Sequence, residues 1–313
     1  MRSTDVIDPA VPADRPDAPA WGLIAAMLAS LFAVQTHRSF TVDPVRAVPV
    51  AALLTTIGIA LAIGIHRRRP RLVAGAQAFL QMTLFTVLGV VLAYALAANA
   101  GPLWDVRLAT MDREIGFRWN AALDLLDRFP PVIWLLGLAY HSLTLQMIVV
   151  IVVLSGMSRF DTLRTTVCAA IMSGFVTILI SGFVPAMGNL FDPSHYRHLW
   201  PSVAWLERGL ISGLRDGSMR TLDLTILIGI VSFPSFHATL AAIFIWAFRS
   251  IPRLALAGQG WALLTIVATP VFGGHYGVDV ITGLALAPPA ILTARYLTRD
   301  RTLSTQIMPR VPA

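Results

Sequence analysis

Eight apolar segments constrain this chain more than any other feature of its sequence. They cover residues 20–37, 46–66, 76–98, 132–154, 164–184, 234–250, 254–272 and 277–297. A helix needs about 20 apolar residues to cross the hydrocarbon core of a bilayer. Only 13% of the residues are charged, whereas soluble domains carry about 25%. The sequence therefore predicts an all-α polytopic membrane protein with about eight transmembrane helices.

The arginines between these segments predict the orientation of the chain. All 24 basic residues are arginines, and clusters such as "HRRRPR" (66–71) follow every second segment. Because basic residues favour the cytoplasmic side, we expect these connections and both termini there. The same bias explains the net charge of +7 better than binding to nucleic acid, for which the chain has no basic motif.

Outside the membrane segments, two long connections are expected on the non-cytoplasmic side. Residues 103–129 mix apolar and charged side chains at helical spacing, which favours a pair of interfacial helices over a simple soluble loop. Residues 185–233 form a long connection rich in aromatic side chains, glycine and proline. Long connections of this kind are often lids or binding loops, and we expect it to shape a binding pocket.

The segments also predict a domain organisation. The expected parts are a disordered cytoplasmic tail, two additional N-terminal transmembrane helices, a main membrane domain of six helices and a second cytoplasmic tail. Their boundaries are 1–19, 20–75, 76–297 and 298–313.

Two histidines stand at helix ends that the predicted topology places on one side of the membrane. His237 begins one apolar segment, with Ser232 or Ser235 as its cap. His275 follows 38 residues later, a length that suits two crossings and a tight turn. Asp279, four residues after His275, then shares its helix face. An ionisable group within the membrane is a functional candidate.

The different neighbours of the two histidines suit different chemical roles. A carboxylate beside an imidazole fixes its tautomer and makes the other ring nitrogen a better nucleophile. We therefore expect His275 to attack and His237 to donate a proton to a leaving group. Phosphoryl transfer suits such a pair, with the helix N-terminus near Ser235 and the loop residues Arg215 or Arg220 as phosphate ligands.

Three other interpretations remain open at this stage. Histidines within a membrane often serve only as hydrogen-bond partners between helices. Two histidines and an aspartate also suit zinc, although the chain lacks the usual close His–His spacing on one helix. In a transporter, the same side chains would relay protons. Inverted repeats or broken helices would favour that interpretation, and the sequence shows neither clearly.

Four motifs resemble those of a known family. "FPSFHATLA" (233–241) resembles the second signature of the type-2 phosphatidic acid phosphatase superfamily, Pro-Ser-x-His. "GGHYGVD" (273–279) resembles the end of its third signature, His-x-x-x-Asp. With "LAYHSLTLQ" (138–146) and "FVPAMGN" (183–189), the chain looks most similar to the inositol-phosphorylceramide synthase branch. The resemblance covers about residues 100–297 and implies a six-helix core, to which the first two segments look like an addition.

The resemblance implies a role for each residue that matches a signature. His275 would be the nucleophile that forms a phosphohistidine, and Asp279 would orient it. His237 would be the acid for the leaving group, and Ser235 would help to bind phosphate. Neither a metal nor another cofactor is implied.

The chain departs from the superfamily at its cationic positions. It has no lysine and no arginine in "FVPAMGN", and Ala268 and Thr269 stand where Ser-Arg normally opens the third signature. The cations that bind phosphate must then come from elsewhere or be fewer. The candidates are Arg215, Arg220, Tyr140 and His141. The simpler interpretations are solvated loop charges for the arginines, an interfacial anchor for Tyr140 and a helix–helix hydrogen bond for His141.

The expected function is transfer or hydrolysis of a phosphoryl group attached to a lipid. The substrate would be a lipid phosphate, and the acceptor would be water or the hydroxyl of a polyol, sugar or ceramide. A simple lipid phosphate or polyprenyl diphosphate phosphatase is the alternative within this class. The active site would lie on the non-cytoplasmic side, periplasmic or extracellular, of an integral membrane protein.

Overall fold

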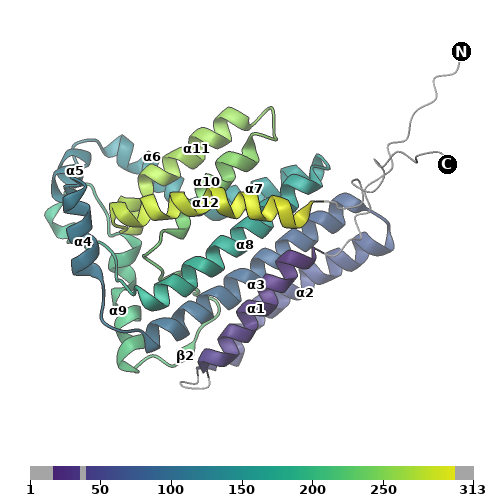
Figure 1. Ribbon diagram of the computed structural model, residues 1–313, viewed down its shortest axis with the longest axis horizontal. Coiled ribbons are helices and arrows are strands. Elements are labelled where there is room, and N and C mark those ends of the chain that lie inside the picture. Colours follow the sequence, from purple (N-terminus) through teal and green to yellow (C-terminus); the bar gives the residue numbers. More distant parts are fainter. Residues whose placement is uncertain (1–16, 36–39, 300–313) are drawn as a thin grey trace, which may run out of the picture.

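The computed structural model describes residues 17–35 and 40–299, and these ranges are mainly helical (Figure 1). The helices are α1 (Ala18–Gln35), α2 (Pro44–His66), α3 (Pro70–Asn99), α4 (Asp105–Glu114), α5 (Trp119–Leu126), α6 (Pro130–His141), α7 (Leu143–Gly156), α8 (Phe160–Phe183), α9 (Val203–Asp216), α10 (Phe236–Phe248), α11 (Ala255–Ala268) and α12 (Gly277–Thr298). The short elements η1 (Pro193–His195) and η2 (Thr269–Gly273) are single turns. The predicted tails lie outside the described residues, apart from their inner ends.

Each of the eight apolar segments forms helix, as the sequence predicts. Five are long and apolar enough to cross a membrane, namely α2, α3, α8, α11 together with η2, and α12. A sixth is the bent pair of α6 and α7. The remaining two, α1 and α10, are shorter apolar helices. The protein is therefore an all-α polytopic membrane protein.

The predicted span 132–154 is not one straight helix, because α6 and α7 meet at Ser142 with a bend of 54°. The Ser142 hydroxyl donates a hydrogen bond to the Ala139 carbonyl at 2.9 Å and accepts one from the Trp261 indole at 2.8 Å. A serine that bonds back to its own helix tends to bend it. The contact from α11 holds this bend in place.

The helices alternate in direction, so the connections gather at two ends of the molecule. We call them the site end, which carries His237 and His275, and the arginine end. At the site end, Tyr94 of α3 donates to the Ile228 carbonyl at 2.9 Å, and the Trp104 N–H donates to the Pro185 carbonyl at 2.8 Å. In Figure 1, α4, α5 and α9 lie at this end, on the left.

The arginine end joins the short connections that carry "HRRRPR". Arg71 donates to the Ser158 hydroxyl at 3.0 Å, which ties the α2–α3 turn to the α7–α8 turn. Thr165 and Thr298 share a hydrogen bond of 3.1 Å between α8 and the end of α12. The arginine-rich turns thus lie at the opposite end of the helices from both histidines.

A central group of helices, α3, α8, α10 and α12, forms most of the core around buried residues such as Leu92, Ile171 and Phe244. By contrast, α2 packs mainly on α3. Only 6% of the most apolar 18-residue stretch of α2 is buried inside the protein. Its exposed side chains include Val48, Leu53 and Ile59. A large exposed apolar surface on a span of this length fits contact with lipid.

Two strands of two residues each form a small parallel sheet between the N-terminal helices and the connection 185–233. β1 (Thr41–Val42) pairs in parallel with β2 (Thr221–Leu222), and Arg46 lies 3.5 Å from Asp223 beside it. The connection 185–233 is therefore anchored by the segment between α1 and α2.

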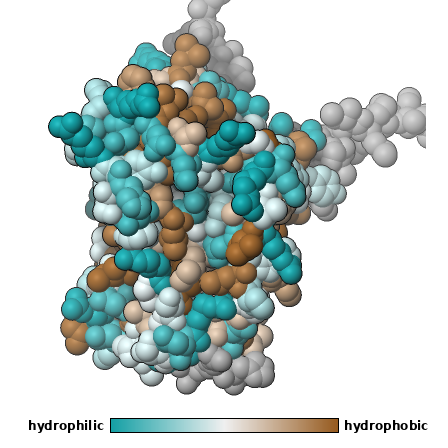
Figure 2. Space-filling model, turned by 90° about the vertical axis from the view of Figure 1, so that its left-hand side faces the viewer, coloured by the Kyte–Doolittle hydropathy of each residue, from teal (hydrophilic) through white to brown (hydrophobic). Residues whose placement is uncertain are grey.

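The two short helices expected within 103–129 are present as α4 and α5. Viewed from the site end, the surface carries many hydrophilic residues mixed with hydrophobic ones (Figure 2). Together with α9, these helices cover the region where α10 and α12 begin (Figure 1).

Candidate active site

His275 lies in a tight turn directly before α12. After η2, Gly274 adopts a left-handed conformation with φ of 72°, which favours glycine. A Cβ atom on Gly273 would lie 2.6 Å from the imidazole of His275 and 3.0 Å from the hydroxyl of Tyr140. The two glycines therefore let the backbone turn close against the ring.

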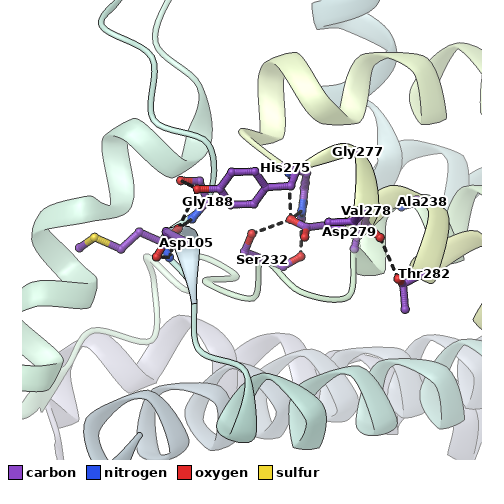
Figure 3. Close-up of polar contacts among 12 residues, drawn as sticks. Asp105, Gly188, Ser232, Ala238, His275, Gly277, Val278, Asp279 and Thr282 are labelled. Carbon is purple, nitrogen blue, oxygen red and sulfur yellow. Dashed lines mark hydrogen bonds and ion pairs between the residues drawn. The ribbon is translucent and has the colours of Figure 1, made fainter. Parts of the chain in front are cut away.

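Asp279 lies beside His275, but the two do not share a helix face as expected, because α12 begins at Gly277 and His275 lies in the turn before it. Asp279 is fully buried, and its Oδ2 lies 3.4 Å from Nδ1 of His275 (Figure 3). The same oxygen accepts hydrogen bonds from the Tyr276 N–H at 3.0 Å and from the Ser232 hydroxyl at 2.8 Å. The carboxylate thus serves both as a cap of α12 and as the partner of the imidazole.

A backbone carbonyl determines which nitrogen of His275 carries the proton. Nδ1 lies 2.9 Å from the carbonyl oxygen of Ser232. A carbonyl oxygen only accepts hydrogen bonds, so Nδ1 must be the donor. In the neutral ring, Nε2 then keeps its lone pair. The Ser232 carbonyl therefore holds the Nδ1 edge of the ring and leaves Nε2 unprotonated in the neutral form.

The sequence suggested Ser232 only as a possible helix cap and gave no indication of its contacts with His275 and Asp279. Its carbonyl holds the imidazole of His275 and its hydroxyl holds the carboxylate of Asp279 (Figure 3). Of the two serines considered as caps, Ser235 caps α10 by accepting the Ala238 N–H at 3.3 Å. The only sequence signal for Ser232 is its place in "SFPSFH".

His237, Tyr140 and His141 gather on the other side of His275. The rings of His237 and His275 lie 6.2 Å apart between centroids. Tyr140 stacks on His237 at 4.6 Å with an angle of 14°, and His141 meets the edge of Tyr140 at 5.1 Å. Three candidate residues from two segments of the sequence, the end of α6 and the start of α10, therefore form one cluster with His275 and Asp279, which we call the dyad.

Ser235 and α10 are fixed to α12 by close backbone contact. The Ser235 N–H donates to the Asp279 carbonyl at 3.0 Å, and Thr239 donates to the Gly283 carbonyl at 2.8 Å. A Cβ at Gly283 would collide with the Ser235 carbonyl. This packing sets the N-terminus of α10, with His237 in its first turn, beside the dyad.

Two aspartates of α4 anchor the loops around the dyad, and the sequence analysis did not identify them. Asp112 is 1% exposed and accepts hydrogen bonds from the N–H groups of Gly277 and Val278, at 2.7 and 2.8 Å. It also accepts the Trp119 indole N–H at 2.8 Å. A carboxylate at a helix N-terminus compensates its unpaired N–H groups and its dipole.

Asp105 likewise accepts backbone N–H groups, but from the connection 185–202 that precedes α9. It accepts the backbone N–H groups of Met187 and Gly188, at 3.0–3.1 Å, and the Tyr276 hydroxyl at 3.1 Å (Figure 3). Asp105 and Asp112 are seven residues apart, a spacing that returns to the same helix face. That spacing was the signal available in the sequence.

Arg215 and Arg220 have partners outside the histidine cluster. Arg215 donates to the Gly101 carbonyl at 2.8 Å, while its Nη1 is buried without a hydrogen-bond partner in the described part of the chain. It lines a small cavity of about 20 Å³ that also reaches Ser232. Arg220 donates to the Leu214 carbonyl at 3.0 Å and lies over a phenylalanine ring. Neither guanidinium contacts a histidine of the site.

The described residues contain no group of three or more His, Cys, Asp or Glu side chains placed to hold a metal ion. The chemistry supported by the geometry is nucleophilic attack by Nε2 of His275, with a second imidazole near enough to exchange protons with a bound substrate.

The described residues thus combine an α-helical membrane fold with a His–Asp dyad at the start of α12 and a second histidine at the start of α10. A family model described as the PAP2 superfamily matches residues 106–293, more than half of the chain. The protein therefore belongs to the PAP2 superfamily, that of the type-2 phosphatidic acid phosphatases. No curated protein and no solved structure matches the chain. Membership in the superfamily supports an activity of the lipid phosphatase or phosphotransferase type.

Proposed function

We propose that the protein is a membrane-embedded lipid phosphotransferase or phosphatase that works through a phosphohistidine on His275. The observation that carries this proposal is the Ser232 carbonyl at 2.9 Å from Nδ1, because this contact leaves the lone pair of the neutral imidazole on Nε2, where it can attack phosphorus. The buried carboxylate of Asp279 favours the imidazolium character that develops as Nε2 attacks.

The first step forms a bond between Nε2 of His275 and phosphorus and breaks the bond from phosphorus to the lipid oxygen. Protonated His237 donates its proton to that departing oxygen. In the second step, an acceptor oxygen attacks phosphorus, its proton passes to His237, and the Nε2–P bond breaks. Water as acceptor gives hydrolysis, and an alcohol gives transfer.

The phosphate ligands proposed here are mostly neutral donors. The N-terminus of α10 at Ser235 presents backbone N–H groups beside the dyad, which is a favourable place for an anion. Tyr140 stacks on His237, and His141 meets the edge of Tyr140, so both lie on the His237 side of the dyad. Arg215 and Arg220 remain proposed ligands, and the unpartnered Nη1 makes Arg215 the better placed of the two.

The depth of the site favours a lipid substrate. Helix α10 has 13 residues and so spans about 20 Å, less than the roughly 30 Å of the hydrocarbon core. Its far end, next to Arg249, lies at the arginine end of the molecule. His237 is then within reach of a lipid headgroup rather than far above the membrane.

The proposal also includes a likeness to the inositol-phosphorylceramide synthase branch and a site on the non-cytoplasmic side of the membrane. The motif "LAYHSLTLQ" supports a likeness to inositol-phosphorylceramide synthases, and its Tyr140 stacks on His237. The arginine-rich turns lie opposite the site, which supports a non-cytoplasmic position by the positive-inside rule.

The test is turnover by the purified protein of phosphatidic acid, a polyprenyl diphosphate and phosphatidylinositol, with and without added alcohols. We expect His275→Ala to lower turnover at least about a thousandfold. His66→Ala, an exposed histidine at the arginine end, is the matched control and should keep full activity. Turnover that survives His275→Ala would refute the nucleophile. A wild-type protein inactive on every donor would contradict the proposal and favour a proton relay.

A further inference from the structure

The segment between β2 and α10 supplies Ser232 to the dyad without any regular structure of its own. Residues 223–235 form neither helix nor strand. The carbonyl of Ser232 nevertheless lies 2.9 Å from Nδ1 of His275, and its hydroxyl donates to Asp279 at 2.8 Å (Figure 3). Because the segment has no internal ladder, contacts from outside it must hold Ser232 in place.

Hydrogen bonds reach this segment at few points. Among the described residues, the stretch 227–234 is hydrogen-bonded to the rest of the protein only through Ser232 and Ile228. The partner of Ile228 is Tyr94 of α3. The Tyr94 hydroxyl donates to the Ile228 carbonyl at 2.9 Å and accepts the Ile228 N–H at 3.3 Å. Tyr94 therefore fixes the backbone four residues before Ser232.

Packing against α3 is incomplete along the same stretch. A cavity of about 20 Å³ lies beside it, lined in part by Ala93 and Ala97 of α3 and by Ile230 and Ser232. Side chains that line a void have no attractive contacts on that side. The two hydrogen bonds of Tyr94 therefore contribute more to the position of the stretch than they would in a close-packed region.

Tyr94 is itself held firmly. It is 4% exposed near the site end of α3, and it belongs to the same buried core as its neighbour Leu92. Helix α3 packs on both α8 and α1. Tyr94 also lies outside residues 106–293, which match the family model. The fixed point for the Ser232 segment thus comes from the N-terminal part of the chain.

We propose that Tyr94 is a positioning residue that sets the Ser232 carbonyl against Nδ1 of His275 and thereby aims Nε2 at the substrate. This inference rests on the proposed function and deepens it, because it adds a residue of α3 to the group that orients the nucleophile. Tyr94 acts through the backbone from Ile228 to Ser232 and not by contact with the reacting atoms. A misplacement of about 1 Å can lower a rate about a hundredfold.

The experiment is a double-mutant cycle on kcat with the purified full-length protein. The donor is whichever of phosphatidic acid, a polyprenyl diphosphate and phosphatidylinositol the wild type turns over fastest. The proteins compared are the wild type, Tyr94→Phe, Ser232→Ala and the double variant. The effect of Ser232→Ala is read as a ratio of kcat within each background, so any unfolded fraction caused by Tyr94→Phe cancels. Residues that act independently have additive effects, whereas coupled residues do not.

We expect Tyr94→Phe to lower kcat at least about tenfold and to change KM less than about twofold, because the orientation of the nucleophile is disturbed and substrate binding is not. We expect the effect of Ser232→Ala to be at least about threefold smaller in Tyr94→Phe than in the wild type, because the hydroxyl is then already displaced from Asp279. Tyr296→Phe, an exposed tyrosine near the end of α12, is the matched control and should keep the wild-type kcat.

Two results of this cycle would overturn the proposal. One is a wild-type kcat in Tyr94→Phe. The other is an equal effect of Ser232→Ala in both backgrounds, which is the result expected if Tyr94 only stabilises the fold.

A second variant tests the proposal if Tyr94→Phe does not fold. Ile228→Gly keeps both backbone groups that bond to Tyr94, but it gives the stretch before Ser232 more conformational freedom. The Ile228 side chain is 37% exposed, so its removal leaves the core intact. We expect a lower kcat, a KM close to that of the wild type and a smaller effect of Ser232→Ala. A wild-type kcat in Ile228→Gly would overturn the positioning role.

The outcomes also separate this inference from the proposed function. Turnover that depends on His275, with unchanged kinetics in Tyr94→Phe, would overturn the positioning role and leave the proposed function standing. Turnover that survives His275→Ala would overturn the proposed function and the role of Tyr94 with it.

Discussion

At the scale of single residues, the contacts of Ser232 decide how His275 presents its ring. The Ser232 carbonyl fixes Nδ1 as a donor, and its hydroxyl places Oδ2 of Asp279 at 3.4 Å from the same nitrogen. The carbonyl belongs to the backbone and survives any substitution, whereas the hydroxyl does not. The two contributions are therefore experimentally separable.

Replacing Ser232 with alanine removes only the hydrogen bond to Asp279. A hydrogen bond to a charged group contributes about 1.5–3 kcal/mol, so we expect kcat to fall about tenfold to a hundredfold. The backbone carbonyl remains, so activity should not fall to the level of His275→Ala. Steady-state kinetics on the best donor measure this, with Ser30→Ala, whose hydroxyl bonds only to its own helix, as control. Wild-type kcat in Ser232→Ala would show that the hydroxyl does not position the dyad.

Glu207 predicts a dependence of stability on pH. Burial raises the pKa of this carboxyl from 4.5 to about 9. Between these values the folded protein binds one more proton than the unfolded chain, so the free energy of unfolding falls as pH rises. The groups that interact electrostatically with this carboxyl, Tyr94 of α3 and Tyr140 of α6, are phenols that ordinarily ionise near pH 10.

We therefore expect Glu207→Gln to lose less stability than the wild type between pH 5 and pH 8. The difference should grow by at most about 1.4 kcal/mol for each pH unit. Thermal unfolding in detergent across this range measures it. Parallel curves of Tm against pH for the two proteins would mean that Glu207 is ionised in the folded state.

At the scale of elements, α4 acts as an anchor for α12 and for the loop before α9. Asp112 compensates the first N–H groups of α12, and Asp105 holds the loop at Met187 and Gly188. Sequence reasoning identified 103–129 as a helix pair but not this role. The i, i+7 spacing was visible, whereas the partner helix, 165 residues away, was not.

Asp112→Asn should destabilise the start of α12, because the amide nitrogen of asparagine cannot accept an N–H. Loss of one such charged hydrogen bond costs about 1.5–3 kcal/mol, which corresponds to a Tm lower by several degrees. Asp124→Asn, an exposed aspartate of α5, is the control. Unaltered Tm and kcat in Asp112→Asn would contradict the anchoring role.

At the scale of the whole molecule, the alternation of helix direction separates the site from the arginine-rich turns. The positive-inside rule then predicts that the site end faces away from the cytoplasm. The same alternation explains how the beginning of α10 and the beginning of α12 meet, since two crossings return the chain to the same end.

Single cysteines test this orientation in intact cells, in a Cys168→Ser background. Asp124→Cys at the site end should react with a membrane-impermeant maleimide, and Arg253→Cys at the arginine end should not. Both native side chains are exposed, so burial does not explain a difference. Labelling of Arg253→Cys alone would reverse the proposed orientation.

The sequence by itself determined the eight helical segments and the shared level of the two histidines. These follow from hydrophobic length, which is a local property. Only the tertiary structure decided the bend at Ser142, the hold of Ser232 on the dyad, the anchoring by Asp112 and the burial of Glu207. Each depends on which distant segment supplies the partner of a polar group, and a burial or a hydrogen bond between segments leaves no periodic signal in the sequence.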